Sequence, residues 1–238
     1  MADIYEEFEF AVRSYECAPD GKVTVANLCN YLQEAASINA EHLGFNKSNF
    51  DAEGLNITWV MTRMRIKCSR RPVWGEKVKI LTFPRNARRI IAHRDFLLEG
   101  VGAATTEWMM IDMNTRRPVS IPEFVTGNGN DVREPVLGAE PFAKFKWEGG
   151  DAGEGLQVAA RASDIDLNGH VNNVRYINWL FDAYGSQPAD AFDFELVFKN
   201  EMRLGETGTA CADGDFARIA DQENKEFCIS HLILPREI

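Results

Sequence analysis

The hydrophobic and polar positions in the first half of the chain form one long helical stripe among several runs with the two-residue period of strands. Apolar residues recur at spacings of three and four from Val25 to Leu43, which predicts a helix over that range. Thr24 is placed to cap the start of this helix and Gly44 its end. Strands are expected before the helix near 8–15, and after it over 57–67, 77–83, 89–98 and 103–112.

The same order of elements recurs in the second half. A strand is predicted near 156–162, followed by a polar turn and by a helix from Val174, which Asn173 is suited to cap and Gly185 to end. Strand-like runs then follow near 195–202, 207–212, 216–220 and 227–234. A strand, a helix and an antiparallel meander therefore occur twice.

This repeated order predicts an α+β fold made of two antiparallel sheets, each wrapping a long helix. The chain divides into an N-terminal unit over 1–125, a connector over 126–150 and a C-terminal unit over 151–238. A hydrophobic content of 45% is enough to bury a sizeable core.

The turn before the second helix is unusually rich in polar side chains. Its poor helix and strand formers are Asp164, Asp166, Asn168, His170, Asn172 and Asn173. A plain capping loop is the alternative interpretation, because Asp and Asn gather at helix starts, but the segment has more polar groups than capping needs. The corresponding turn of the first half reads Asp20-Gly21-Lys22 and has no histidine, so one active site per chain is expected.

The run DLNGHVNNVRY, over residues 166–176, resembles the signature of acyl-ACP thioesterases, double-hotdog enzymes of plant plastids and many bacteria. Further blocks resemble the N-terminal half of that family in order: Tyr31, Leu32, Gln33, Glu34 and Ala35, then Trp59, Val60, Thr62, Arg63 and Met64, then Trp74 and Gly75, then Trp108 with Met110, and Thr115, Arg116 and Arg117 ahead of Ile121 and Pro122. These blocks cover most of the chain. The resemblance implies a tandem hotdog fold and hydrolysis of the thioester that joins a fatty acyl chain to acyl carrier protein.

Thioester hydrolysis needs an activated water or nucleophile and stabilisation of the oxyanion that forms on the carbonyl. Asn168 can point an amide N–H at that carbonyl, and the helix start near Val174 adds backbone N–H groups. His170 can donate or accept a proton near neutral pH. Asp166 is close enough in sequence to orient either side chain, or to act as base or nucleophile. A thiolate leaves easily, so no metal or cofactor is expected.

By resemblance, the remaining catalytic residue is Glu201, which would activate water or hold His170. Two plain alternatives stay open, with Asp166 as a turn former and Glu201 as a solvated strand charge. Plant members of the family have a cysteine directly after this glutamate, where this chain has Met202. A Cys-His-Asn mechanism would therefore need Cys211 or another cysteine. We predict acid–base catalysis instead, by Asp166, Asn168, His170 and Glu201.

The acyl chain is expected to lie in an apolar slot built mainly by the first half. Its candidate walls are Trp59, Met61, Met64, Trp108 and Met110. An aromatic and Met-rich strand face is more often plain core than a ligand wall, so both interpretations stay open.

The net charge of −10 is unevenly distributed. Residues 63–94 contain eleven basic side chains against a single acidic one, Glu76, so this stretch carries +10 and the remainder −20. Exposed strand faces often carry Lys and Arg, but a stretch this basic suits nucleic acid, an anionic membrane or an acidic protein. No nucleic-acid-binding motif accompanies it. We expect it to dock acyl carrier protein through Arg63, Arg65, Arg70, Arg71, Arg88 and Arg89.

Other properties of the sequence bear on the cellular location, the state of the cysteines and the pairing of chains. No stretch approaches the roughly 18 apolar residues of a membrane span, and signal or transit features are missing, so a cytoplasmic location is expected. Five cysteines without a C-x-x-C pair favour reduced, mostly buried thiols. Pairing of two chains as a homodimer stays open. So do two other functions, an acyl-CoA thioesterase with the same chemistry and a hotdog protein that binds acyl groups without hydrolysing them.

Overall fold

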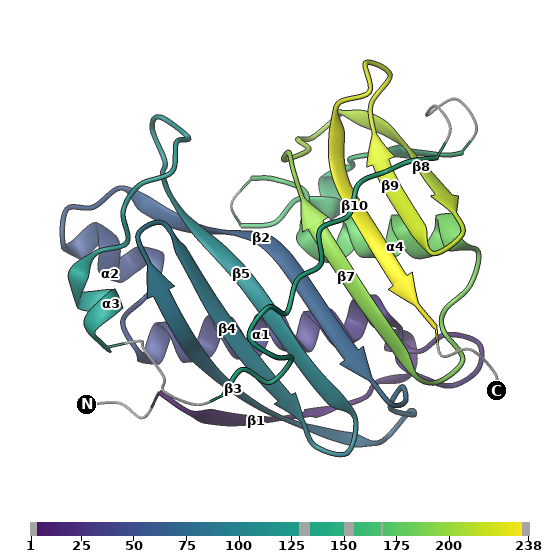
Figure 1. Ribbon diagram of the computed structural model, residues 1–238, viewed down its shortest axis with the longest axis horizontal. Helices are drawn as coiled ribbons and strands as arrows, with labels where there is room; N and C mark the ends of the chain where they lie inside the picture. The colour runs from purple at the N-terminus through teal and green to yellow at the C-terminus, as the bar shows by residue number, and fades with distance from the viewer. Residues whose placement is uncertain (1–3, 129–133, 150–154, 168, 235–238) are drawn as a thin grey trace.

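The strands of this chain form one antiparallel sheet. The computed structural model describes residues 4–128, 134–149, 155–167 and 169–234. From edge to edge, the ten strands of these residues run β1-β3-β4-β5-β2-β7-β10-β9-β8-β6 (Figure 1). The first half supplies β1 (Glu6–Ala11), β2 (Ile57–Cys68), β3 (Lys77–Arg88), β4 (Ile91–Leu98) and β5 (Gly102–Asp112). The second half supplies β6 (Leu156–Ala159), β7 (Phe192–Phe198), β8 (Thr207–Asp213), β9 (Phe216–Ala220) and β10 (Glu226–Ile233).

The two expected sheets are joined along one seam, between β2 and β7. Arg63 pairs with Val197 at one end of this seam and Cys68 pairs with Phe192 at the other. Without this pairing, each strand would be an edge with unsatisfied N–H and C=O groups. The tandem arrangement of two sheets is confirmed, and the seam fuses them into a continuous sheet.

Two long helices, α1 (Val25–His42) and α4 (Asn173–Tyr184), lie against the same face of this sheet. α1 lies behind the first-half strands and α4 behind the second-half strands (Figure 1). Leu32 of α1 and Ile177 of α4 are both fully buried and belong to the same hydrophobic core. Burial of one such side chain contributes about 1.5–3 kcal/mol, so the apolar faces of both helices hold the two halves together.

These helices begin and end near the capping residues predicted from the sequence, except that the cap of α4 lies one residue earlier. The hydroxyl of Thr24 accepts a hydrogen bond from a backbone N–H in the first turn of α1, as predicted. Gly185 ends α4 with φ of 80°, a conformation that favours glycine. The cap of α4 is Asn172, not Asn173, whose amide instead donates to Gln33 on α1 at 3.2 Å.

Two short helices do not follow from the sequence pattern. They are α2 (Lys47–Ala52) and α3 (Glu123–Asn128), each of six residues. Their buried residues Phe50 and Val125 form a second hydrophobic cluster with Ile57 and Met110 at the far end of the first-half sheet. A helix of six residues is too short to show a helical period. No helix in the described ranges is both long and apolar enough to span a membrane.

The turns that precede α1 and α4 are built alike. They follow the 3-10 helices η1 (Ser14–Glu16) and η2 (Ala162–Asp164). In the first turn the N–H of Ala18 donates to the carbonyl of Lys22, and in the second the N–H of Asp166 donates to the carbonyl of His170, both at 2.9 Å. Corresponding residues are 148 positions apart, as Ala18 is from Asp166. The repeated order of elements therefore extends to individual backbone hydrogen bonds.

The connector covers the seam on the face opposite the helices (Figure 1). Arg63 of β2 donates to the carbonyl of Ala143, and Arg65 donates to the carbonyl of Pro141. The ring of Phe142 lies over the Arg63 guanidinium, with its centroid 4.9 Å from the central carbon. The outer side of β2 is consequently closed by the protein itself.

Candidate functional site

A histidine, a carboxylate and a guanidinium meet beside the turn that precedes α4. Nε2 of His170 lies 3.2 Å from Oε2 of Glu201. Nη2 of Arg116 forms an ion pair with the same oxygen and lies 3.5 Å from Nε2 of His170. The side chains of His170, Glu201 and Arg116 are 17%, 35% and 30% exposed, so the cluster is partly open to solvent. The predicted residues His170 and Glu201 are therefore in direct contact.

The turn fixes His170 through its backbone. The carbonyl of His170 accepts the N–H of Asp166, and Oδ1 of Asp166 accepts the N–H of His170 at 3.4 Å. Ile165 and Val171 form an antiparallel bridge that encloses the turn. Asp166 thus shapes the turn, as expected of a turn former. Its catalytic role stays a prediction.

Glu201 is held close to this turn by the residue that follows it. Met202 is fully buried, and its N–H donates to the hydroxyl oxygen of Tyr176 on α4 at 2.8 Å. The carbonyl of Met202 accepts the N–H of Val171 at 3.0 Å. Burial raises the pKa of Tyr176, so this hydroxyl stays protonated at neutral pH. The chain at Glu201 is thereby tied to both α4 and the polar turn.

Arg116 is missing from the site residues predicted from the sequence. It lies in the turn after β5, within the block 115–117 by which the chain resembles its family. No periodicity or spacing relates this turn to Glu201, which is 85 residues further along the chain. In the sequence, Arg116 is part of a polar block just past the end of a predicted strand, a position where functional residues are common.

Two kinds of oxyanion donor were expected from the sequence, the amide of Asn168 and the backbone N–H groups at the start of α4. Asn168 lies outside the described residues, so its contact with a thioester carbonyl stays a prediction. The contribution expected from the helix start is wrong for Val174, because its N–H already donates to Oδ1 of Asn172 at 2.9 Å. The next N–H, of Arg175, donates to the carbonyl of Asn172 at 2.8 Å. Asn172 is a cap, and it occupies the N–H groups of Val174 and Arg175.

An apolar cavity of about 250 Å³ lies between α1 and the first-half strands. The predicted residues Trp59 and Trp108 line it. The predicted residues Met61, Met64 and Met110 do not, because they are at most 3% exposed and pack in the hydrophobic clusters. A bulge in β2 after Met61 shifts the buried positions from odd to even residues, which turns Met64 into the core. The methionines follow the plain-core interpretation.

One face of α1 contacts both the start of α4 and the cavity. Gln33 of α1 accepts a hydrogen bond from Asn173, the first residue of α4. Ala36 and Ala40, which line the cavity, follow at spacings of three and seven residues and so share the face of Gln33. Three residues correspond to about 5 Å along a helix. α1 therefore connects the start of α4 with the wall of the cavity.

A second hollow, of about 640 Å³, lies along the connector. Its lining includes the charged residues Lys144, Lys146, Glu148 and Asp213, and none of its lining residues belongs to the polar turn. This hollow is larger, and neither hollow is lined by a described residue of the polar turn. The lining of the smaller cavity includes Arg94 and His93, but apolar side chains predominate there, so it suits a fatty acyl chain better.

The basic residues of β2 are paired with acidic residues across the seam. Arg63 lies 2.9 Å from Glu195, and Arg65 forms two bonds, at 2.8 and 2.7 Å, with Asp193. The connector covers both arginines, as described above. Burial raises the pKa of Glu195, so the nearby guanidinium of Arg63 helps to keep its charge. A docking role for Arg63 and Arg65 is wrong, since these charges are neutralised and covered within the protein.

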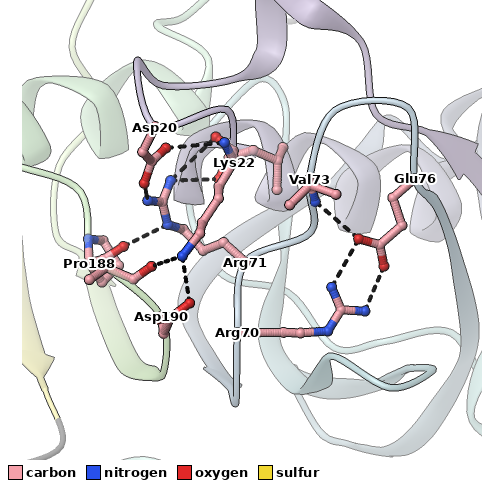
Figure 2. A network of polar contacts seen from close by, with 10 residues as sticks. Asp20, Lys22, Arg70, Arg71, Val73, Glu76, Pro188 and Asp190 are labelled. Atoms are coloured by element: carbon pink, nitrogen blue, oxygen red, sulfur yellow. Dashed lines mark hydrogen bonds and ion pairs between the residues drawn. The ribbon is translucent and has the colours of Figure 1, made fainter.

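Arg71 holds together three separate segments (Figure 2). Its side chain forms an ion pair with Asp20 and donates to the carbonyls of Lys22, Val23 and Pro188. Arg71 is only 2% exposed, so its predicted docking role is wrong. The neighbouring Arg70 forms two hydrogen bonds with Glu76, at 2.9 and 2.6 Å, and its charge is therefore offset as well (Figure 2).

Arg88 and Arg89 remain exposed at the tip of the β3–β4 hairpin. Ile91 pairs with Met109, so this tip and the end of β5 lie at the same end of the sheet. The carbonyl of Arg89 also accepts the N–H of Ile121 at 2.7 Å. The turn that carries Arg116 starts from this end of β5. Arg88 and Arg89 therefore lie on the same side of the fold as the candidate site, whereas the exposed Lys67, Lys77 and Lys79 of the same stretch lie elsewhere on β2 and β3.

Of the three other histidines, His42 and His231 have structural surroundings, and His93 also lines the apolar cavity. His42 contacts Glu6, and the ring of His231 stacks on Phe216 with centroids 4.3 Å apart. His93 contacts Asn86 and a glutamate of β5. Among the described residues, no group of three or more His, Cys, Asp and Glu side chains is arranged to hold a metal ion.

Comparisons of the sequence find the same family in both halves. The acyl-ACP thioesterase N-terminal domain matches residues 3–127, and the acyl-ACP thioesterase C-terminal domain matches residues 150–236. Oleoyl-acyl carrier protein thioesterase 1 of Arabidopsis thaliana is 30% identical over 218 residues, which cover 81% of this chain and 58% of the relative. A palmitoyl-acyl carrier protein thioesterase of Gossypium hirsutum is 32% identical over 188 residues, covering 73% and 46%. The chain spans about half the length of these chloroplastic relatives.

Solved structures share the fold over nearly the whole chain. An acyl-ACP thioesterase from Bacteroides thetaiotaomicron has a TM-score of 0.79 and 25% identity, covering 96% of this chain and 97% of its own. The 12:0-ACP thioesterase from Umbellularia californica has a TM-score of 0.81 and 22% identity, covering 98% and 97%. These similarities confirm the tandem hotdog architecture.

Proposed function

This chain belongs to the acyl-ACP thioesterase family, and from that membership we propose that it hydrolyses the thioester of acyl-[acyl-carrier protein] to free fatty acid and holo carrier protein. The observation that carries the proposal is the contact between His170 and Glu201, in a fold that also has an apolar cavity lined by Trp59 and Trp108. An acid–base pair together with an apolar cavity suits a substrate with a reactive polar end and a long apolar chain.

The proposed reaction is the attack of water on the thioester carbonyl. The pair His170–Glu201 removes a proton from the water as its oxygen bonds to the carbonyl carbon, and the carbonyl oxygen becomes an oxyanion. Asn168 is proposed to donate its amide N–H to that oxyanion. The carbon–sulfur bond then breaks, and the thiolate of the carrier takes up the proton that the pair had removed. Water and acyl carrier thus yield a fatty acid and a thiol.

The test of this proposal is a comparison of substrates on the purified protein. Acyl-ACP and acyl-CoA of the same chain are supplied separately, and the release of free fatty acid is measured. Faster release from acyl-ACP supports the proposal, whereas faster release from acyl-CoA would assign the chain to the rival acyl-CoA activity. Binding of acyl-ACP without any release would leave only a non-hydrolytic acyl-binding role. A mixed acyl-ACP pool would then show which chain lengths fit a cavity of about 250 Å³.

Charge reversal at Arg88 and Arg89 should lower kcat/KM for acyl-ACP by about tenfold or more, with little change in kcat. Both residues are exposed at the hairpin tip, and acyl carrier proteins are acidic. Exposed charges act mainly on the rate of encounter, and salt screens them beyond roughly 8 Å at physiological ionic strength. The measurement is steady-state hydrolysis of acyl-ACP by Arg88→Glu/Arg89→Glu over a range of salt concentrations.

The matched control reverses two basic residues on the connector, Lys144→Glu/Lys146→Glu, which changes the net charge by the same amount. A small acyl-pantetheine substrate serves as the second control, because it lacks the acidic protein. If the connector reversal lowers kcat/KM for acyl-ACP as much as the hairpin reversal does, the effect comes from net charge alone. In that case Arg88 and Arg89 do not form the docking surface.

Thiol-alkylating reagents should inhibit the enzyme weakly. The position that carries a cysteine in plant members is Met202, and it is fully buried. Burial raises the pKa of Cys68 to about 12 and also raises the pKa of Cys29 and Cys228, so few reactive thiolates are present at neutral pH. Treatment with iodoacetamide should leave most of the activity while mass spectrometry shows modification first at the half-buried Cys17. Rapid, stoichiometric inactivation that substrate prevents would point to a cysteine nucleophile.

A further inference from the structure

Arg116 is a first-half side chain that reaches the acid–base pair of the second half. Its Nη2 atom forms an ion pair with Oε2 of Glu201, the same oxygen that lies 3.2 Å from Nε2 of His170. Side-chain nitrogens from different halves of the chain therefore converge on one carboxylate oxygen. The catalytic candidates of the second half are complete only when the first half is in place.

The turn that carries Arg116 is tightly built. Oδ1 of Asp112 accepts the N–H groups of Asn114 and Thr115 at 3.0 and 2.7 Å, and these bonds lower the pKa of Asp112. The N–H of Arg116 donates to the carbonyl of Asp112 at 2.8 Å, and the N–H of Asp112 donates to the carbonyl of Arg117 at 3.0 Å. The turn is thus a rigid base for the Arg116 side chain.

Arg116 has a left-handed backbone, with φ of 56°. This conformation costs a residue with a Cβ about 1–2 kcal/mol, and glycine would adopt it freely. The arginine at this position has its side chain directed toward the second half, where it pairs with Glu201.

Glu201 needs such a partner to hold one orientation. Its backbone is fixed through Met202, but its side chain is 35% exposed and has several rotatable bonds. Fixing a glutamate side chain costs on the order of 1–2 kcal/mol of conformational entropy. A partly exposed ion pair contributes less than about 1 kcal/mol to folding, so the pair with Arg116 matters for geometry more than for stability.

Nε2 of His170 faces a donor and an acceptor at once. Arg116 can only donate, so Nε2 accepts from its Nη2 atom at 3.5 Å when the imidazole hydrogen is on Nδ1. When Nε2 carries a hydrogen, that hydrogen faces Oε2 of Glu201, which lies 3.2 Å away and can only accept. In either tautomer Arg116 and His170 lie against the same carboxylate oxygen of Glu201.

We propose that Arg116 is a positioning residue that holds the Glu201 carboxylate against His170, so that the first half of the chain completes the catalytic pair of the second. This inference rests on the proposed thioesterase activity for its kinetic test. Its structural content, the dependence of His170 on Arg116 through Glu201, can be measured without turnover.

The kinetic test uses an acyl-pantetheine substrate, which removes any effect on carrier docking. Arg116→Ala, which keeps a Cβ and the strained backbone, should lower kcat by about 10- to 100-fold with KM changed less than about twofold. Arg116→Lys should restore part of kcat, because an ammonium can still reach the carboxylate. Arg117→Ala, at the exposed neighbouring position, is the control and should leave kcat unchanged.

A double-mutant cycle tests whether Arg116 acts through Glu201. In a Glu201→Gln background, Arg116→Ala should cost less than about threefold in kcat, because the carboxylate that it holds is gone. An equal loss in both backgrounds would overturn the proposal, as would an Arg116→Ala enzyme with normal kcat.

An NMR measurement separates this proposal from the proposed function. The ring ¹⁵N signals of His170, assigned with His170→Gln, should move in Arg116→Ala and in Glu201→Gln but not in Arg117→Ala. If they move while the wild-type protein hydrolyses no thioester, the positioning role stands and the proposed function fails. If they do not move in Arg116→Ala, the positioning role is wrong whatever the activity.

Discussion

Replacing His170 by alanine should lower kcat for acyl-ACP by about 100- to 10,000-fold without lowering the melting temperature. Loss of a general acid–base group typically has an effect of this size. The imidazole is 17% exposed and contacts Glu201 and Arg116 at the protein surface, so its removal leaves no large cavity in the core. The loss should appear in kcat rather than in KM, because the ring serves charge that develops during the reaction. Stopped-flow or steady-state release of fatty acid measures the first quantity and calorimetry the second.

The control for this variant is His42→Ala. His42 also contacts a glutamate, Glu6, but it lies at the end of α1 and has no place in the proposed reaction. Its replacement should leave kcat within about twofold of the wild-type value. A folded His170→Ala protein with near-normal turnover would remove the acid–base pair from the mechanism.

Replacing Arg71 by methionine should lower the free energy of unfolding by about 3 kcal/mol. The guanidinium is buried, and its loss would remove a donor from Asp20 and from the carbonyls of Lys22, Val23 and Pro188. The carbonyl of Lys22 would keep the N–H of Ala18 as a donor. Asp20 is 42% exposed and water can reach it, so most of the loss should come from the carbonyls. Urea denaturation monitored by tryptophan fluorescence measures the change.

Arg70→Met is the matched control for this prediction. Arg70 is the neighbouring arginine and has two bonds to Glu76, but its side chain is 39% exposed. Its replacement should cost less than about 1 kcal/mol, as is usual for exposed pairs. Equal stability of the two variants would mean that water or a shift of the chain replaces the Arg71 guanidinium.

The sequence predicted the long elements of this fold well, because their periodicity is set by burial on one face. The helix expected over 25–43 is observed over Val25–His42, and the strands of both meanders are recovered with ends moved by a few residues. The seam between β2 and β7 could not be predicted in the same way. Edge pairing depends on two strands that are far apart in sequence, and alternation along one strand does not name its neighbour.

The part of the candidate site that lies in one short segment could be predicted from the sequence. The part that comes from a distant segment could not. The polar turn with His170 is a compact motif, and family resemblance added Glu201. Arg116 comes from another turn, and only the three-dimensional fold brings it to Glu201. The helix cap was missed by one residue, since Asn172 and Asn173 are chemically the same and only backbone geometry decides between them.

The basic stretch shows what charge counting leaves out. Its net charge of +10 was correct, but Arg63, Arg65 and Arg71 find their acidic partners outside the stretch, at Glu195, Asp193 and Asp20. A one-dimensional count cannot include partners that folding brings from distant segments. The exposed charges of this stretch near the candidate site are Arg88 and Arg89, a much smaller surface than the sequence indicated.

The matching turns before α1 and α4 also bear on how such a protein can change over generations. In a dimer of identical chains, every mutation appears in both turns at once, so a change that strengthens one and spoils the other cannot be separated. A continuous chain removes that constraint, because each turn has its own codons. Lys22 stands at the position that corresponds to His170, and it donates to Asp190 at 2.6 Å as part of the network around Arg71. One copy of the turn is thereby free to serve as a brace while the other copy retains its chemistry. Selection for heat resistance could act on the first copy, and selection for turnover on the second, with little conflict between them.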